Sequence, residues 1–260
     1  MKIFALLNFC RFSLLITTLC LSSIARSANI PLIAATSSLK FPLQEIALAF
    51  QQDTGHHIRI SYASSGNLTR QIQQGAPFEL FLSANHNYIK QLYQQNKTQD
   101  EGMIYARGRL VLLNNKQFQI KSDTGLAELK EILTKGTIKH FAIANPKHAP
   151  YGFAAREALQ QQGLWPLIQP YLVFGENVSQ AAQFVSSGAA DLGLVSYSLT
   201  FAPALQKTTH ATLVDAAQHQ PLLQTMVLLK GASETTKLFY RFMQQTKARK
   251  ILTRFGYSTP

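Results

Sequence analysis

The stretch Ala34-Ala35-Thr36-Ser37-Ser38-Leu39-Lys40 decides the fold of this chain. It follows an apolar run at residues 30–33, which is typical of a short buried strand, and it precedes a helical pattern over residues 43–50. A serine at such a junction caps the helix. The unpaired N–H groups of a first helical turn can also bind an anion.

The same construction occurs a second time. An alternating segment, Ile58–Tyr62, predicts a strand, and Ala63-Ser64-Ser65-Gly66 follows it before a helix that starts at Asn67. Open α/β sheets bind ligands at the carboxyl ends of neighbouring parallel strands. Two such junctions favour a shared ligand site, with simple helix capping as the alternative.

Short apolar segments alternate with helical patterns along the rest of the chain, which predicts an α/β architecture. The predicted strands span residues 80–82, 109–113, 141–144, 172–174, 191–195 and 222–230. The predicted helices span residues 86–95, 125–134, 153–162, 178–187, 233–243 and 246–255. Composition marks no boundary between domains.

The chain has 260 residues and a formal charge of +12, with 46% hydrophobic and 15% charged residues. The hydrophobic fraction predicts a globular protein with a sizeable core. The basic residues are scattered except at Lys247-Ala248-Arg249-Lys250. A solvated face of a terminal helix explains that cluster better than a nucleic-acid stripe does, so we predict no nucleic-acid partner.

Residues 1–27 are predicted to be a signal peptide that is removed, with an apolar core at Phe12–Leu21 that is too short to span a bilayer. Cys10 and Cys20 both lie in this segment, so the remaining chain is predicted to hold no disulfide, cysteine–metal site or cysteine nucleophile. That remainder has 22 basic and 13 acidic residues, a charge of +9. We predict a soluble, exported protein.

The chain resembles the periplasmic molybdate-binding protein family, the substrate-binding components of ABC importers, from about residue 29 to residue 257. The segments that carry the resemblance are 34–39, 61–66, 68–77, 80–84, Tyr105-Ala-Arg-Gly-Arg-Leu-Val111, Asn145-Pro-Lys-His-Ala-Pro-Tyr-Gly152, 154–159, Gly175-Glu-Asn-Val178 and Arg254-Phe-Gly-Tyr257.

The resemblance implies a two-lobed periplasmic-binding-protein fold of type II, with mixed, mostly parallel sheets and a hinge of two crossing strands. One crossing falls near residues 109–113 and the other near 213–226. Residues 28–108 together with 226–260 would form lobe I, and residues 109–225 would form lobe II.

The resemblance also implies the residues that bind the oxyanion. Ser38 and Ser65 would bind through the hydroxyl and the backbone N–H, and Tyr151 and Val178 through the backbone N–H. A fifth contact in some members is a tyrosine hydroxyl, and Ser196 stands at that position here.

Tyr197 lies one residue after Ser196 and is the alternative fifth contact. A shift of one residue at a strand end turns the side chain to the opposite face.

Molybdate and tungstate are dianions without a proton at neutral pH, so a site built only of donors suits them. Phosphate keeps a proton and would favour an acidic acceptor, whereas sulfate is also donor-only. The resemblance implies a monomeric binding protein without enzyme activity or cofactor. Molybdenum would be present only within the bound oxyanion, and the partner would be an inner-membrane ABC permease with its ATPase.

Two alternatives belong to other classes. Ser37-Ser38-Leu39-Lys40 matches the S-x-x-K pattern of serine enzymes, although Ser122-Asp123-Thr124 and Lys135-Gly136-Thr137 do not supply the S-D-N and K-T-G elements. The same fold could instead bind a small organic anion, for which Arg70 is the nearest candidate.

Overall fold

The structure is a computed structural model that describes residues 30–118, 120 and 126–258. Residues 31–260 form one unit. The predicted signal peptide, both cysteines and Gly125, the expected first residue of a helix, lie outside the described residues. None of the helices in the described part of the chain is long and apolar enough to cross a membrane.

The first sheet has five strands in the order β2-β1-β3-β10-β4. Its strands are β1 (Leu32–Thr36), β2 (Arg59–Ala63), β3 (Leu80–Ser83), β4 (Met103–Gly108) and β10 (Leu222–Leu228). Strand β1 runs parallel to β2 and β3, whereas β10 pairs antiparallel with β3 and β4. The carboxyl ends of β1, β2 and β3 therefore meet at one edge.

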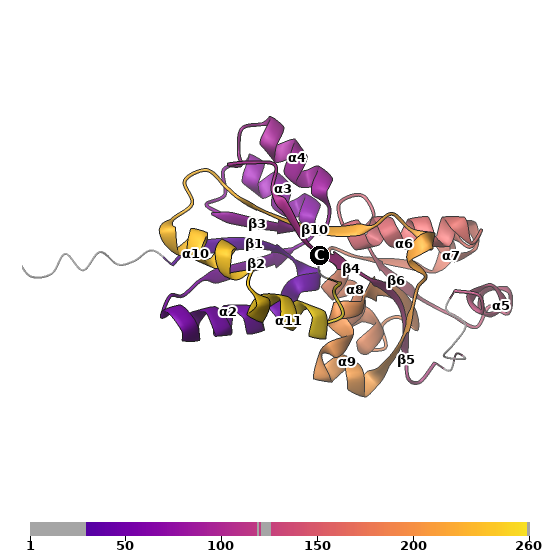
Figure 1. The fold of residues 1–260 in the computed structure, drawn as a ribbon. Helices are drawn as coiled ribbons and strands as arrows, with labels where there is room; N and C mark the ends of the chain where they lie inside the picture. Colours follow the sequence, from indigo (N-terminus) through magenta and orange to yellow (C-terminus); the bar gives the residue numbers. More distant parts are fainter. Residues whose placement is uncertain (1–29, 119, 121–125, 259–260) are drawn as a thin grey trace, which may run out of the picture. The chain divides into compact units, whose positions relative to one another are not determined.

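Helices cover both faces of the first sheet (Figure 1). They are α2 (Lys40–Thr54), α3 (Ser65–Gln73), α4 (His86–Gln94), α10 (Glu234–Phe242) and α11 (Thr246–Arg254). Successive residues of β1 divide between the two faces, as the two-residue period of a strand requires. Ile33 and Ala35 pack in the core beneath α2, α10 and α11, and Ala34 packs in the core beneath α3 and α4.

The second sheet has the order β7-β6-β8-β5-β9. Its strands are β5 (Leu110–Asn115), β6 (Phe141–Ala144), β7 (Leu172–Gly175), β8 (Leu192–Ser196) and β9 (Thr209–Leu213). Strand β6 is parallel to β7 and β8, and β5 is antiparallel to β8 and β9. Its helices are α5 (Leu129–Thr134), α6 (Pro150–Gln161), α7 (Trp165–Ile168), α8 (Val178–Ser186) and α9 (Pro203–Thr208).

Four short 3-10 helices complete the described elements: η1 (Ser37–Leu39), η2 (Gln169–Tyr171), η3 (Tyr197–Phe201) and η4 (Ala216–Gln218). We call the first sheet with its helices the first lobe, and the second sheet with its helices the second lobe. The structure confirms the predicted α/β class with mixed sheets.

The chain passes between the two sheets twice. Strand β4 ends at Gly108 in the first sheet and β5 begins at Leu110 in the second, so Arg109 alone connects them. Strand β9 ends at Leu213, and β10 begins in the first sheet at Leu222. The exact division into lobes at residues 108–109 and 225–226 stays a prediction.

Several boundaries differ from the sequence-based expectation. Helix α6 begins at Pro150 instead of residue 153, because proline suits the first helical position, where its missing N–H leaves no bond unmade. Strands β4 and β9 were not anticipated as separate strands. Strand β9 is an edge strand whose residues are mostly exposed, so it lacks the apolar run that marks a buried strand.

Glu79 holds the start of α10 against the loop before β3. Its Oε2 accepts hydrogen bonds from the Ser233 N–H at 2.8 Å, the Ser233 hydroxyl at 2.5 Å and the Thr236 hydroxyl at 2.6 Å. Burial raises the pKa of the Glu79 carboxyl, but these three hydrogen bonds outweigh it and hold the pKa below its ordinary value.

We therefore expect Glu79→Ala to lower the free energy of unfolding at pH 7 by about 2 kcal/mol, the range for losing hydrogen bonds to a charged group. A lowered folded-state pKa stabilises the protein above the unfolded-state pKa, and this contribution is lost as pH falls through the folded-state pKa. Urea unfolding should thus show that the wild-type protein and Glu79→Ala differ less in unfolding free energy at pH 3 than at pH 7. Glu101→Ala, which removes an exposed carboxylate, is the control. If Glu79→Ala lowered the unfolding free energy equally at both pH values, the charge of Glu79 would not be the cause.

Candidate functional site

Four of the predicted site residues lie in first turns of helices that follow strands. Ser38 is in η1 after β1, Ser65 begins α3 after β2, Tyr151 is the second residue of α6 after β6, and Val178 begins α8 after β7. The backbone N–H groups of these four residues have no hydrogen-bond acceptor among the described residues. Each turn therefore presents a free donor at the positive end of its helix dipole.

The turn at Ser38 meets elements of the second lobe. The N–H of Ser179, next to Val178, donates to the Ser37 hydroxyl at 3.4 Å. The hydroxyl of Ser198, in η3, donates to the Ser38 carbonyl oxygen at 2.6 Å. The junction after β1 thus contacts both the start of α8 and the segment after β8.

The turn at Ser65 meets the segment that leads into α6. The Gly66 N–H donates to the His148 carbonyl oxygen at 2.9 Å, and the Ser64 hydroxyl lies 2.8 Å from His148 Nδ1. A Cβ on Gly66 would lie 2.6 Å from that carbonyl oxygen, so only glycine permits this approach. Tyr151 follows three residues after His148 and is brought beside the turn at Ser65.

A third contact joins the start of α3 to the start of α8. Asn67 Nδ2 donates to Glu176 Oε2 at 3.4 Å, and His148 Nε2 lies 3.7 Å from the same oxygen. The Glu176 side chain is 71% exposed, so its carboxylate lies at the rim and not inside. These bonds bring the four turns from both lobes together around one site.

The side chains of the predicted residues are buried and uncharged. Ser38 is fully buried and Tyr151 is 1% exposed, and the Tyr151 phenol lies among the hydroxyls of Ser38, Ser196 and Tyr257. The Ser65 oxygen accepts from the Ala84 N–H at 3.0 Å, which leaves its own proton free to donate. These four residues offer N–H and O–H donors and no carboxylate, which suits a small, fully deprotonated anion.

Ser196 and Tyr197 point to different surroundings. The Ser196 hydroxyl is fully buried and lies 2.8 Å from the Ser198 hydroxyl, among the hydroxyls near Ser38. The Tyr197 ring packs edge-on against Phe201 at 5.0 Å and under the Arg109 guanidinium at 5.3 Å. Of the two residues, Ser196 faces the site.

Two residues near the site were not anticipated. The Tyr257 hydroxyl donates to the Ser198 hydroxyl at 3.2 Å from the end of the chain. His148 links Ser64 with Glu176 at the rim. Both belong to segments that carry the family resemblance, but no spacing in the sequence connects either of them with the serine junctions.

The surroundings of Ser37, Lys40 and Arg70 support neither a serine enzyme nor a site for an organic anion. Lys40 is exposed and its Nζ lies 5.8 Å from the Phe41 ring, and the Ser37 hydroxyl accepts from a backbone N–H. Arg70 is exposed and its Nη2 contacts Asn67 Oδ1. No cluster of three potential metal-ligating side chains occurs in the parts of the chain that the structure describes.

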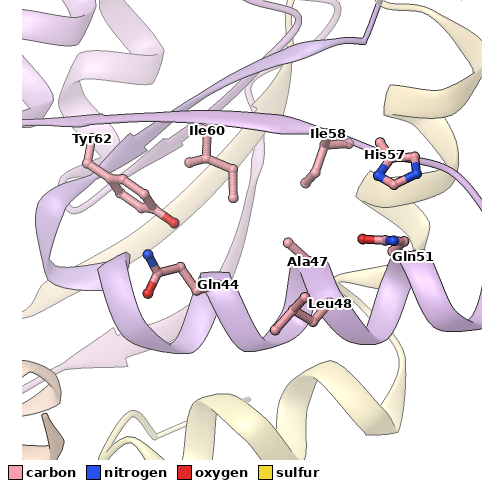
Figure 2. A pocket seen from close by; sticks show the side chains of 8 residues that line it. All are labelled: Gln44, Ala47, Leu48, Gln51, His57, Ile58, Ile60 and Tyr62. Atoms are coloured by element: carbon pink, nitrogen blue, oxygen red, sulfur yellow. The ribbon is translucent and has the colours of Figure 1, made fainter. Parts of the chain in front are cut away.

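A separate groove of about 490 Å³ lies between α2 and β2 (Figure 2). Helix α2 lines it with Gln44, Ala47, Leu48 and Gln51, and the segment that leads into and forms β2 lines it with His57, Ile58, Ile60 and Tyr62. None of the predicted site residues lines it, so this groove is distinct from the four turns.

His148 is held as a neutral ring. Burial lowers its pKa, the Glu176 carboxylate raises it, and Arg70 lowers it, with a net pKa below the ordinary value. The Ser64 oxygen already accepts from the Asn67 N–H, so its proton is free to donate to His148 Nδ1. A ring proton on Nε2, on the side of Glu176, fits this arrangement.

We expect Glu176→Gln to lower the pKa of His148 further, because the variant removes the negative charge that favours the imidazolium. Arg70→Gln should raise that pKa, because it removes a positive charge. Proton NMR titration of the histidine rings measures both, with the exposed His56 as the internal control. A His148 pKa that neither substitution moves would show that the three groups are not near one another in solution.

The family described as bacterial extracellular solute-binding protein matches residues 31–258. The chain is 33% identical over 229 residues to the molybdate-binding protein ModA of Rhodobacter capsulatus, covering 87% of each chain. It is 32% identical over 240 residues to ModA of Azotobacter vinelandii, covering 91% of this chain and 92% of that protein. The solved periplasmic molybdate-binding protein of Azotobacter vinelandii is similar in fold, with a TM-score of 0.78, 30% identity, and coverage of 88% of this chain and 99% of that one.

Proposed function

Because the chain belongs to the periplasmic molybdate-binding proteins, a group of bacterial extracellular solute-binding proteins, we propose that it binds molybdate, and also tungstate, among its four helix turns. The predicted two-lobed periplasmic-binding-protein fold is confirmed by the likeness to the Azotobacter vinelandii structure. The family consists of binding proteins, and the chain is accordingly a binding protein and not an enzyme.

One observation carries the proposal: four backbone donors without an acceptor among residues 30–118, 120 and 126–258 belong to turns that hydrogen bonds join across the two lobes. They are the N–H groups of Ser38, Ser65, Tyr151 and Val178. Hydrogen bonds to a charged acceptor contribute about 1.5–3 kcal/mol each. Several together can offset the cost of removing a dianion from water without an arginine or lysine. The free hydroxyls of Ser38 and Ser65 add to this set of donors.

The donor set also separates the candidate anions. Phosphate keeps a proton near neutral pH and needs an acceptor for it, and the nearest carboxylate, Glu176, is exposed and faces His148 and Asn67. Sulfate is fully deprotonated, so hydrogen-bond chemistry does not distinguish it from molybdate. We propose that the size of the site makes that distinction, with a small organic anion as the remaining alternative.

We propose that the lobes close around the anion by a hinge at Arg109 and at the segment between Leu213 and Leu222. The bonds of Gly66 and Asn67 to the second lobe belong to the closed form. A closed, monomeric protein in the periplasm would then deliver the anion to an ABC permease and its ATPase. Export would depend on residues 1–27, and no cofactor is needed.

The first test is isothermal titration of the protein lacking residues 1–27 with molybdate, tungstate, sulfate and phosphate. We expect tight binding of molybdate and tungstate, and no heat from phosphate. Sulfate should give a weak response or none, because its smaller radius leaves donors unsatisfied. Absence of heat with all four anions would refute the proposed function, and tighter binding of sulfate would reassign the ligand.

Ser38→Ala and Ser65→Ala should both weaken molybdate binding by about 10- to 100-fold, the range for loss of a hydrogen bond to a charged acceptor. Their effects on stability should differ. The Ser38 hydroxyl bonds to no backbone group among the described residues, so its loss should change the melting temperature of the unliganded protein little. Ser65→Ala should lower it, because the buried Ala84 N–H loses its acceptor. Unchanged molybdate affinity in Ser38→Ala would remove this hydroxyl from the site.

A further inference from the structure

Three polar groups of the first lobe bond to one residue of the second lobe, His148. The Ser64 hydroxyl lies 2.8 Å from the His148 ring Nδ1, and the Gly66 N–H donates to the His148 carbonyl oxygen at 2.9 Å. The Tyr88 hydroxyl, from α4, donates to the same carbonyl oxygen at 3.3 Å. The His148 side chain is only 13% exposed, and a hydrogen bond shielded from water is stronger than an exposed one.

The turn that carries His148 is fixed within its own lobe. It joins the end of β6 to the start of α6, and Asn145 closes it. The Asn145 carbonyl oxygen accepts from the N–H groups of His148 at 3.3 Å and Ala149 at 2.9 Å. The Asn145 N–H donates to the Gly175 carbonyl oxygen, in β7, at 2.8 Å. His148 therefore moves with the second lobe, and its bonds to the first lobe exist only when the lobes are together.

These bonds fall on both sides of a proposed anion-binding residue. Ser64 and Gly66 flank Ser65, whose N–H has no acceptor among the described residues. Ser64 is also the N-cap of α3, because its hydroxyl oxygen accepts from the Asn67 N–H at 3.4 Å. The contact with His148 thus fixes the direction of the free Ser65 N–H relative to the second lobe.

The fit leaves no space for a side chain at position 66. A Cβ there would lie 2.6 Å from the His148 carbonyl oxygen, 2.8 Å from the Tyr88 hydroxyl oxygen and 2.9 Å from the His148 Cβ. Two of these three atoms belong to the second lobe, and the third is the end of a flexible side chain. Gly66 is the second residue of α3, where the helix itself accepts alanine. Alanine at this position would therefore obstruct the docking of His148 without straining the first lobe.

We propose that His148 is a latch that holds the lobes closed over the bound oxyanion and thereby slows its release. This inference rests on the proposed function. His148 is a positioning residue, because it acts through Ser64 and Gly66 on either side of Ser65 and not by touching the anion. The latch engages after the anion has entered. Its loss should therefore raise the rate of release and leave the rate of association unchanged.

The test measures how fast the protein lacking residues 1–27, and variants of it, release molybdate. Each protein is loaded with radiolabelled molybdate, diluted into unlabelled molybdate and collected on a filter over time. We expect Gly66→Ala, which obstructs all three bonds, to release the anion about 10- to 100-fold faster than wild type, with association changed by less than about threefold. His148→Ala removes only the ring acceptor and should accelerate release by about threefold to tenfold.

Two further variants separate the latch from a general effect on structure. Adding His148→Ala to Gly66→Ala should accelerate release little more, because the first substitution has already opened the latch. Gln71→Ala, at an exposed position of the same helix, is the control and should leave both rates unchanged. The melting temperature of unliganded Gly66→Ala should not fall, because alanine suits a helix better than glycine does.

Three kinetic results would overturn the inference: wild-type release in Gly66→Ala, a change confined to the association rate, or full additivity in the double variant. A lower melting temperature of unliganded Gly66→Ala would overturn it as well, because the contact would then hold the protein together without the anion. Wild-type protein that binds no molybdate in isothermal titration would instead refute the proposed function, so the two failures are distinguishable.

Discussion

The site depends on one constraint of helical structure: the first N–H groups of a helix have no partner within it. In this chain, helices follow the carboxyl ends of β1, β2, β6 and β7, and the N–H groups of Ser38, Ser65, Tyr151 and Val178 have no acceptor in the part of the chain that the structure describes. Such donors are costly to bury unless something accepts from them. Because these donors come from both lobes, an anion bound between the lobes could accept hydrogen bonds from all of them.

The neutrality of the site contrasts with the charge of the chain. The formal charge is +12, yet no lysine or arginine is among the residues that converge at the turns. Helix dipoles and hydroxyls hold a dianion through the number and direction of their hydrogen bonds. An anion that carries a proton is disfavoured, because its proton needs an acceptor. The scattered basic residues can raise the local concentration of anions without contacting them.

The lobes meet through hydrogen bonds and through apolar packing, such as that of the Phe201 ring of the second lobe against Phe255 of the first. Gly66, Asn67 and Ser37 of the first lobe bond to His148, Glu176 and Ser179 of the second. Most of these groups are partly exposed, so water can replace each bond when the lobes separate. Two apolar clusters lie within the first lobe, whereas the cluster of the second lobe also includes Ala84 and Leu222 of the first.

The sequence by itself determined the α/β class, the junctions at Ser38 and Ser65 and, through the family resemblance, the residues Tyr151 and Val178. Local patterns sufficed because hydrophobic periodicity and helix starts are properties of neighbouring residues. Only the tertiary structure decided that Ser196 faces the site while Tyr197 packs elsewhere, and that Tyr257 and His148 lie beside the site. The contact of Tyr257 with Ser198 and that of His148 with Ser64 join residues 59 and 84 positions apart, which no spacing along the chain encodes.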